Sequence, residues 1–291
     1  MIAIPIESAE SALAPCISTL PARNDNDDSG WCSLPDICRL LGIADFSGPC
    51  DSRFQRRRVK AGQWVFSAGE KFNAVFIVYA GFLKTLLMDD DGNQQILGFP
   101  MKGDLLGIDG LHNQQYASQA VALTDCDLVV IPFHELTTLG HEYVTLENWL
   151  YRTVGRELVR EHGVVGLLGT MGAEARVARF LVALSARFAA IGYSPSCFNL
   201  RMTRQEIGSY LGLTLETVSR SLSALHDAGL IHINQRAVEV RDFASLRSLQ
   251  KIPSITKIQR QAASHEVSSL APPLKVNRPQ LMWAGLSAVP A

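Results

Sequence analysis

The chain has 291 residues, of which 47% are hydrophobic and 19% charged, and its formal net charge is −1. This composition is typical of a soluble globular protein of about two domains, and six cysteines are too few for a secreted disulfide scaffold. No run approaches the roughly 18 consecutive apolar residues of a membrane span. The N-terminus also lacks the basic region and apolar core of a signal peptide, so we expect a cytoplasmic protein with no membrane partner.

The first half of the chain predicts a β-rich domain over residues 31–140. Residues 1–30 end in the acidic stretch NDNDDSG, which predicts a disordered N-terminal segment. From Arg53 onward, short β-rich runs are separated by glycines at intervals of 7 to 12 residues, which favours a compact barrel or roll. A hairpin turn is expected at Asp89-Asp90-Asp91-Gly92. A β-sandwich without a ligand is the alternative that this pattern leaves open.

A long amphipathic helix is predicted next, from His134 to about Leu168, and residues 141–169 are taken as the helical segment between the two domains. Its apolar stripe consists of Val144, Trp149, Leu150, Val154, Leu158, Val165 and Leu168. Such a helix between two domains needs a partner surface, and the alternative partner is the β-rich domain of its own chain. A further helix is expected to open at Met171 and to run through Phe188.

Residues 203–227 predict two short helices joined by a tight turn. Thr203 and Glu206 have the spacing of a capping box, Gly212 ends the first helix, and Thr214 is the expected N-cap of the second. The second helix has an apolar side and a polar side. Its apolar side consists of Leu215, Val218, Leu222 and Leu225, and its polar side of Glu216, Ser219, Arg220 and Ser223.

The run LIHINQRAVEVRD from Leu230 predicts a small β-hairpin with Arg236 at its tip, so residues 170–250 read as a winged helix-turn-helix. The polar side of the second helix carries groups that read base edges, since Arg donates to guanine and Glu accepts from the amino group of cytosine. The alternative is a solvated face with a Glu216 to Arg220 ion pair. We expect the DNA contacts to come from Thr203, Arg204, Thr214, Glu216, Thr217, Ser219, Arg220, Ser223 and Arg236.

The distribution of charge agrees with double-stranded DNA as the partner. Residues 1–169 hold 13 Lys and Arg against 21 Asp and Glu, a net charge of −8. Residues 170–250 hold nine against six, and residues 251–291 hold five against one, which together give +7. The basic half thus contains the predicted winged helix-turn-helix, which is called the reader below. Residues 251–291 are rich in Ser and Pro and predict a disordered basic tail.

The stretch IGSYLGLTLETVSRSL closely resembles the DNA-binding domain of the Crp/Fnr transcription regulators. Glu216, Ser219 and Arg220 stand in the Glu-x-x-Ser-Arg pattern of the Fnr branch. The resemblance implies an α+β fold with an N-terminal cyclic-nucleotide-binding-type β-roll, a long dimerisation helix and a C-terminal winged helix-turn-helix. It also implies a homodimer that binds an inverted repeat of TTGAT-like half-sites. We further expect an activator whose protein partner is RNA polymerase.

The same resemblance gives an expectation about cyclic AMP. In the family this ligand is held by a Glu in a Gly-Glu-Leu run and by a downstream Arg-Ser pair on the phosphate. This chain has Gly103-Asp104-Leu105, and Tyr116-Ala117-Ser118 stands near the place of the pair, without its Arg. We therefore expect the chain not to bind cyclic AMP.

The Fnr branch holds an iron-sulfur cluster on four cysteines. Cys32 and Cys38 match two of these positions, but Asp28 and Ser29 stand where the first is expected and Val129 stands at the ligand position of the β-roll. We therefore expect no cofactor, and we expect a regulator in oxygen or redox-linked gene control that acts constitutively, through its expression level or through cysteine oxidation. The alternative is a cluster-containing oxygen sensor with non-standard ligands. That cluster would use Cys32 and Cys38 with Cys16, Cys50 or Cys126.

Catalytic signatures are missing from the sequence, which contains no GxSxG, HExxH, Gly-rich phosphate loop or CxxC pair. We therefore expect no enzyme. A second alternative is a ligand-binding β-roll regulatory protein without a role on DNA. Such a protein would share the first half of the chain only, so the helix-turn-helix argues against it.

Overall fold

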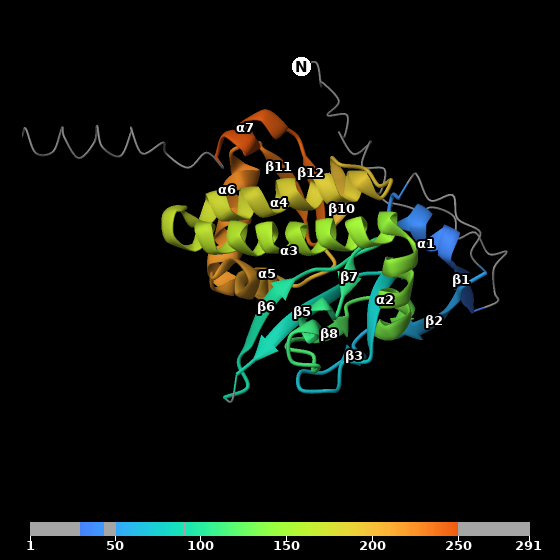
Figure 1. Ribbon diagram of the computed structural model, residues 1–291. Coiled ribbons are helices and arrows are strands. Elements are labelled where there is room, and N and C mark those ends of the chain that lie inside the picture. Colours follow the sequence, from blue (N-terminus) through green and yellow to red (C-terminus); the bar gives the residue numbers. More distant parts are fainter. Residues whose placement is uncertain (1–29, 44–50, 90, 250–291) are drawn as a thin grey trace, which may run out of the picture. The chain divides into compact units, whose positions relative to one another are not determined.

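The computed structural model describes residues 30–43, 51–89 and 91–249, apart from the side chains of residues 160–170 (Figure 1). The expected N-terminal segment, apart from Gly30, and the expected basic tail therefore lie outside the described residues. Within the described part, none of the helices is long and apolar enough to cross a membrane.

The first half is a roll of two antiparallel sheets, as predicted. One sheet has the strand order β1-β2-β9-β4-β7 and the other the order β3-β8-β5-β6. Their strands are β1 (Trp31–Ser33), β2 (Arg53–Val59), β3 (Trp64–Phe66), β4 (Ala74–Ala80), β5 (Leu83–Met88), β6 (Gln94–Gly98), β7 (Leu105–Leu106), β8 (Gln119–Ala122) and β9 (Cys126–Pro132). Two short helices, α1 (Leu34–Leu40) and the 3-10 helix η1 (Ile108–Leu111), lie in the connections.

The side chains of β4 and a group of stacked aromatic rings fill the core of the roll. Val75, Ile77 and Val78 of β4 are at most 1% exposed, so this strand is buried on both faces. The ring of Tyr116 stacks on that of Phe66 with centroids 4.2 Å apart, and its hydroxyl donates to the carbonyl of Ala74 at 2.7 Å. The aromatic core thus ties the loop before β8 to β4.

The expected hairpin turn lies between β5 and β6. The carboxylate of Asp89 accepts hydrogen bonds from the backbone amides of Asp91 and Asn93, at 3.1 and 2.7 Å. Gly92 has a φ of 81°, which residues other than glycine rarely adopt. These are the features that the run of acidic residues followed by glycine predicts for a turn.

The long helix expected from His134 is in fact two helices, α2 (Phe133–Glu142) and α3 (Val144–Thr170). Tyr143 between them has an extended backbone with φ −123° and ψ 99°, and it packs partly buried against the core of the roll. The apolar pattern continues through this break, since Leu139 and Leu146, seven residues apart, are both buried in the same core. The periodicity of the sequence therefore could not show that the chain leaves the helical conformation at Tyr143.

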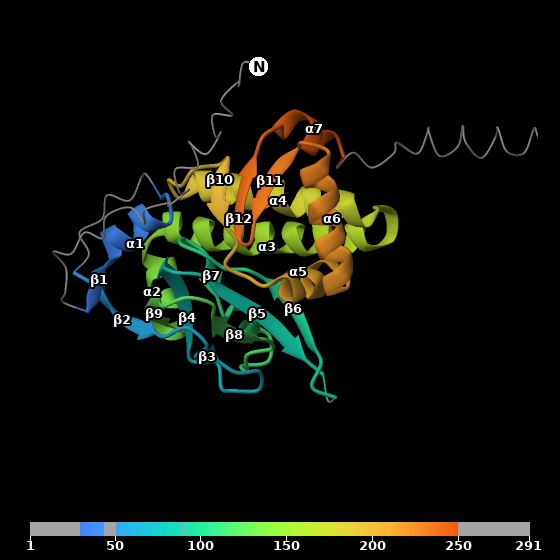
Figure 2. The same ribbon diagram turned by 180° about the vertical axis from the view of Figure 1, so that it is seen from behind.

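The second half consists of helices packed around a three-stranded sheet of order β10-β12-β11. Its elements are α4 (Ala173–Ala190), β10 (Cys197–Asn199), α5 (Arg204–Leu211), α6 (Leu215–Asp227), β11 (Ile231–Asn234), β12 (Ala237–Val240) and α7 (Phe243–Ser248). The sequence predicted all of these except β10 and α7. Both views of the molecule show α6 beside the β11–β12 hairpin (Figures 1 and 2).

Gly208 makes the tight turn between α5 and α6 possible. A Cβ atom at this position would lie 2.5 Å from the carbonyl oxygen of Leu213, and the Leu213 amide donates to the Gly208 carbonyl at 2.9 Å. Gly140 in α2 is a helical glycine whose Cβ would meet nothing within 4 Å. The two glycines therefore have opposite requirements for space.

We predict that Gly208→Ala lowers the free energy of unfolding by about 1 to 3 kcal/mol, because the added methyl group forces the turn apart. Gly140→Ala, the matched control, is expected to raise it by up to about 1 kcal/mol, because alanine has the higher helix propensity. Denaturant unfolding followed by circular dichroism measures both. Equal stability of the two variants would show that the turn adjusts without cost.

Candidate nucleic-acid interface

The two helices of the predicted reader are capped as their sequence requires. The Thr203 hydroxyl accepts from the Glu206 amide at 3.1 Å, and the Glu206 carboxylate accepts from the Thr203 amide at 2.7 Å, which confirms the capping box. The helix α5 ends at Gly212, whose φ is 63°. The hydroxyl of Thr214 then accepts from the Thr217 amide at 3.2 Å and begins α6. These caps set the relative orientation of the two helices.

The apolar side of α6 faces the core, with one exception. Val218, Leu222 and Leu225 are at most 3% exposed, as predicted. Leu215 is 44% exposed, so its expected burial was wrong. It lies in the first turn, where Thr214 and Glu216 are exposed as well, so this end of the helix projects beyond the core.

The polar side of α6 is open to a ligand. Glu216, Arg220 and Ser223 are exposed, and Thr217 and Ser219 are half-buried. Hydrogen bonds from its own backbone amide and from Thr214, with the nearby charge of Arg220, lower the pKa of Glu216 below its usual value. Glu216 is therefore ionised at neutral pH and accepts hydrogen bonds only.

One contact between the helices was not foreseen. The guanidinium of Arg204, near the start of α5, donates to the hydroxyl of Ser219 on α6 at 3.2 Å. The two residues are 15 positions apart, and each was predicted separately as a DNA contact. The hydrogen bond orients Ser219 and places a positive charge beside the polar side of α6.

The predicted wing is present as the β11–β12 hairpin. Asn234 pairs with Ala237, which leaves Gln235 and Arg236 as the two turn residues, and both are exposed. Gln235 has a φ of 53° and shares the tip with Arg236, although the sequence analysis named Arg236 alone. The amide of Ile233 donates to Nδ1 of His226 at 3.4 Å, so the hairpin is linked to the end of α6.

Of the cysteines that would hold a cluster, those that the structure describes lie in the apolar core of the roll. Cys32 on β1 and Cys38 on α1 are 4% and 2% exposed. Val129, at the expected ligand position, is fully buried and has no ligating atom. Cys16 and Cys50 lie outside the described residues, and in the described part no three His, Cys, Asp or Glu residues are grouped to hold a metal ion.

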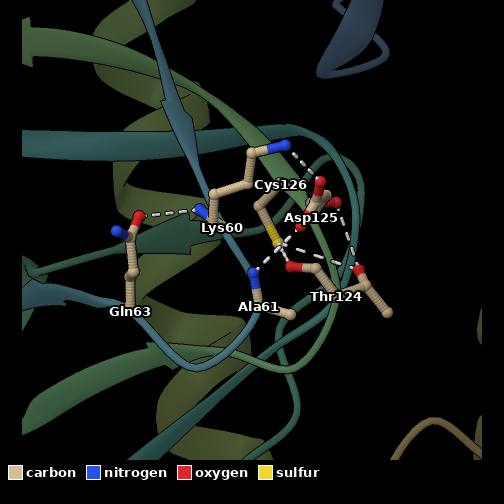
Figure 3. Close-up of polar contacts among 6 residues, drawn as sticks. All are labelled: Lys60, Ala61, Gln63, Thr124, Asp125 and Cys126. Carbon is tan, nitrogen blue, oxygen red and sulfur yellow. Dashed lines mark hydrogen bonds and ion pairs between the residues drawn. The ribbon is translucent and has the colours of Figure 1, made fainter.

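Cys126 is also enclosed, at the start of β9 (Figure 3). Its thiol donates to the carbonyls of Thr124 and Phe82, and burial raises the pKa of this thiol. Neighbouring Lys60 and Asp125 form an ion pair of 2.7 Å that is open to solvent. The described cysteines therefore fit the packing of a core better than the ligand set of a cluster. Cys197 of β10 is disulfide-bonded.

Asp104, which stands where the family has the Glu of its Gly-Glu-Leu run, makes polar contacts within the chain. The Asp104 carboxylate accepts from the Met101 amide at 2.8 Å and forms an ion pair with Arg187 of α4. The adjoining cavity, lined by Gly103, Asp104 and Trp149 among others, measures about 40 Å³.

Comparison with known proteins supports both halves of this description. Residues 56–143 match the model of the cyclic nucleotide-binding domain, and residues 175–249 match that of the Crp-like helix-turn-helix domain. The transcriptional regulatory protein btr of Bordetella pertussis is 39% identical over 79% of this chain and 96% of its own length. The transcriptional activator protein anr of Pseudomonas aeruginosa is 37% identical over 80% of this chain and 95% of its own length.

A solved structure has the same architecture. FixK2 from Bradyrhizobium japonicum superposes with a TM-score of 0.62 and 28% identity, over 69% of this chain and 99% of that one. The chain is therefore a DNA-binding transcription regulator and not an enzyme, which excludes the β-roll protein without a role on DNA. It belongs to the Crp/Fnr family.

Proposed function

We propose that the protein binds, as a homodimer, an inverted repeat of TTGAT-like half-sites and acts in oxygen- or redox-linked gene control. The observation that carries the proposal is the polar side of α6, where Glu216, Ser219 and Arg220 lie together at the end of the helix that projects from the core. In helix-turn-helix proteins this end of the recognition helix meets the base edges.

The chemistry of this face suits base reading. Arg220 is exposed and donates two parallel hydrogen bonds to a guanine, and ionised Glu216 accepts from the amino group of a cytosine. We assign the phosphate contacts on either side to the hydroxyls of Thr203, Thr214, Thr217 and Ser223 and to Arg204 and Arg236. Ser219, held by Arg204, joins the base-reading group. A helix whose polar side only faced solvent would not require Glu216, Ser219 and Arg220 to be grouped at its projecting end.

A second copy of the chain is the partner that suits α3. Val144, Tyr151 and Leu158 are spaced seven residues apart, Val154 lies between the last two, and all four are 37 to 64% exposed. This is the spacing of a coiled-coil seam. Trp149 and Leu150 are half-buried, so Tyr151 replaces them in the stripe, while the side chains of Val165 and Leu168 lie outside the described part.

The proposed signal is linked to oxygen or redox state without a bound cluster. Relatives named the anaerobic regulatory protein, from Pasteurella multocida, and electron transport regulator A, from Shewanella oneidensis, support a link to oxygen or redox state. Cys32, Cys38 and Cys126 are buried, which disfavours their oxidation, so among the described residues the burial supports constitutive action or action through expression level. The alternative, a cluster held by Cys32 and Cys38 with Cys16, Cys50 or Cys126, requires these core thiols to rearrange. RNA polymerase is the expected protein partner in the cytoplasm.

Arg220→Ala tests base reading. We expect affinity for the inverted TTGAT repeat to fall by about 1 to 3 kcal/mol, the contribution of one bidentate base contact, and the preference at one base pair to relax. Fluorescence anisotropy with the repeat and with unrelated DNA measures both effects. Arg39→Ala, which removes an exposed arginine of α1, is the matched control and should change neither affinity. An equal loss on unrelated DNA would make Arg220 a phosphate contact instead.

Leu158→Asp tests the dimer surface. A charge buried in the seam is expected to cost several kcal/mol, so the variant should be a monomer by light scattering and should bind the repeat no better than a half-site. Leu87→Asp on β5 changes a leucine that is 42% exposed and should remain a dimer. A dimeric Leu158→Asp protein with full affinity would show that α3 does not carry the dimer.

Purification without oxygen tests the cofactor. We expect iron and sulfide below stoichiometric amounts, and the same affinity for the repeat with and without air. Cys32→Ala combined with Cys38→Ala should keep this affinity, with some loss of stability because both side chains are buried. A brown protein that binds DNA only without oxygen, and loses both properties in the double variant, would establish the cluster.

A further inference from the structure

The helix α5, the first helix of the reader, covers one edge of the four-stranded sheet. β6 is the last strand of this sheet. Ser209 of α5 accepts a hydrogen bond from the amide of Ile96 and donates one to the carbonyl of Gln94, both at 2.9 Å. The side chain of Gln95 also donates to the Ser209 carbonyl at 2.6 Å. Figures 1 and 2 show α5 against this end of the sheet.

Two ion pairs also join the roll to the DNA-binding half. Lys84 of β5 contacts Glu206 of α5 at 2.7 Å, and both side chains are 16% exposed. Burial acts to raise the pKa of Glu206, but the hydrogen bonds from Lys84 and Thr203 hold it below its usual value. Arg187 of α4 pairs with Asp104 of the roll. Partly buried pairs of this kind depend on fixed geometry, because each charge has lost part of its water.

Aromatic packing makes the contact continuous. The ring of Phe99, just after β6, lies 5.4 Å from that of Tyr210 and 6.0 Å from that of Phe180, between ring centroids. Phe82 of the roll lies 5.7 Å from Phe188 of α4. One apolar cluster therefore includes residues of the roll, of α4 and of the reader helices. The reader is packed on the roll as part of the same core.

A rigid contact has a geometric consequence for a dimeric reader. The turn at Gly208 holds α5 to α6, so whatever fixes α5 also fixes the recognition helix. One base pair adds about 3.4 Å to DNA and turns it by about 35°, so two recognition helices held rigidly fit one separation of half-sites. A DNA-binding half that could move would follow a change of separation.

We propose that the contacts of Lys84, Asp104 and the β6 edge with Glu206, Arg187 and Ser209, here called the roll–reader contact, determine which half-site spacing the protein accepts. The inference rests on the proposed binding of an inverted repeat as a dimer. It assigns a specificity role to residues that do not touch DNA. Lys84 and Ser209 are the members whose side chains can be shortened or neutralised with least change of volume.

The test compares full-length wild type with Lys84→Met combined with Ser209→Ala. Affinity is measured by fluorescence anisotropy for repeats whose spacer is optimal or is changed by one or two base pairs, and for a single half-site. Lys60→Met is the matched control, since it removes a lysine from the exposed ion pair with Asp125. Circular dichroism checks the fold of each variant.

Wild type and the Lys60 variant are expected to lose about tenfold or more in affinity when the spacer changes by one base pair. In the double variant this preference should shrink by about tenfold, the change in binding that the loss of one charge-assisted hydrogen bond can produce. Affinity for the single half-site should not change, because the reading face is intact.

A double variant that keeps the wild-type spacing preference would overturn the inference. If wild type binds the repeat no better than the half-site, the proposed dimeric function fails instead, and the two failures are distinct. Should the double variant not fold, Asp104→Asn, which has the same shape and lacks the charge, undergoes the same comparison. Its unchanged preference would likewise count against the roll–reader contact.

Discussion

Burial of one side of α6 is the interaction on which the DNA-binding half depends. Val218 and Leu222 are almost completely buried, and each contributes about 1.5 to 3 kcal/mol relative to an exposed position. The opposite side contributes little to folding, because Glu216, Arg220 and Ser223 are exposed. Stability and recognition are therefore assigned to different residues of one helix, and the recognition residues can differ among relatives without unfolding it.

Local signals in the sequence were sufficient for much of the fold. The first of the expected β-rich runs begins at Arg53, where β2 begins, and the capping box of Thr203 and Glu206 begins α5 as expected. Such features depend on neighbouring residues, through alternation, turn chemistry and capping. The polar side of α6 could likewise be predicted, because the helical period determines which residues share a face once the start of the helix is known.

Features that depend on distant residues could not be predicted. The break at Tyr143 reflects packing on the roll, and nothing in the residues around it interrupts the apolar period. Ser209 looks like an ordinary polar residue in a helix, and its role is visible only because Gln94 and Ile96 lie beside it. Asp104 matches a nucleotide-binding position in the sequence, whereas in the structure its partner is Arg187, 83 residues away.

The covered edge of β6 also bears on how the chain is made. A ribosome releases residues 94–98 more than a hundred positions before Ser209, so the roll emerges while that edge still has backbone groups without a partner. An open edge strand is a template for pairing with a strand of another molecule. Nascent chains are therefore most prone to aggregate between synthesis of the roll and arrival of α5, and a fragment that ends before α5 would carry this hazard permanently.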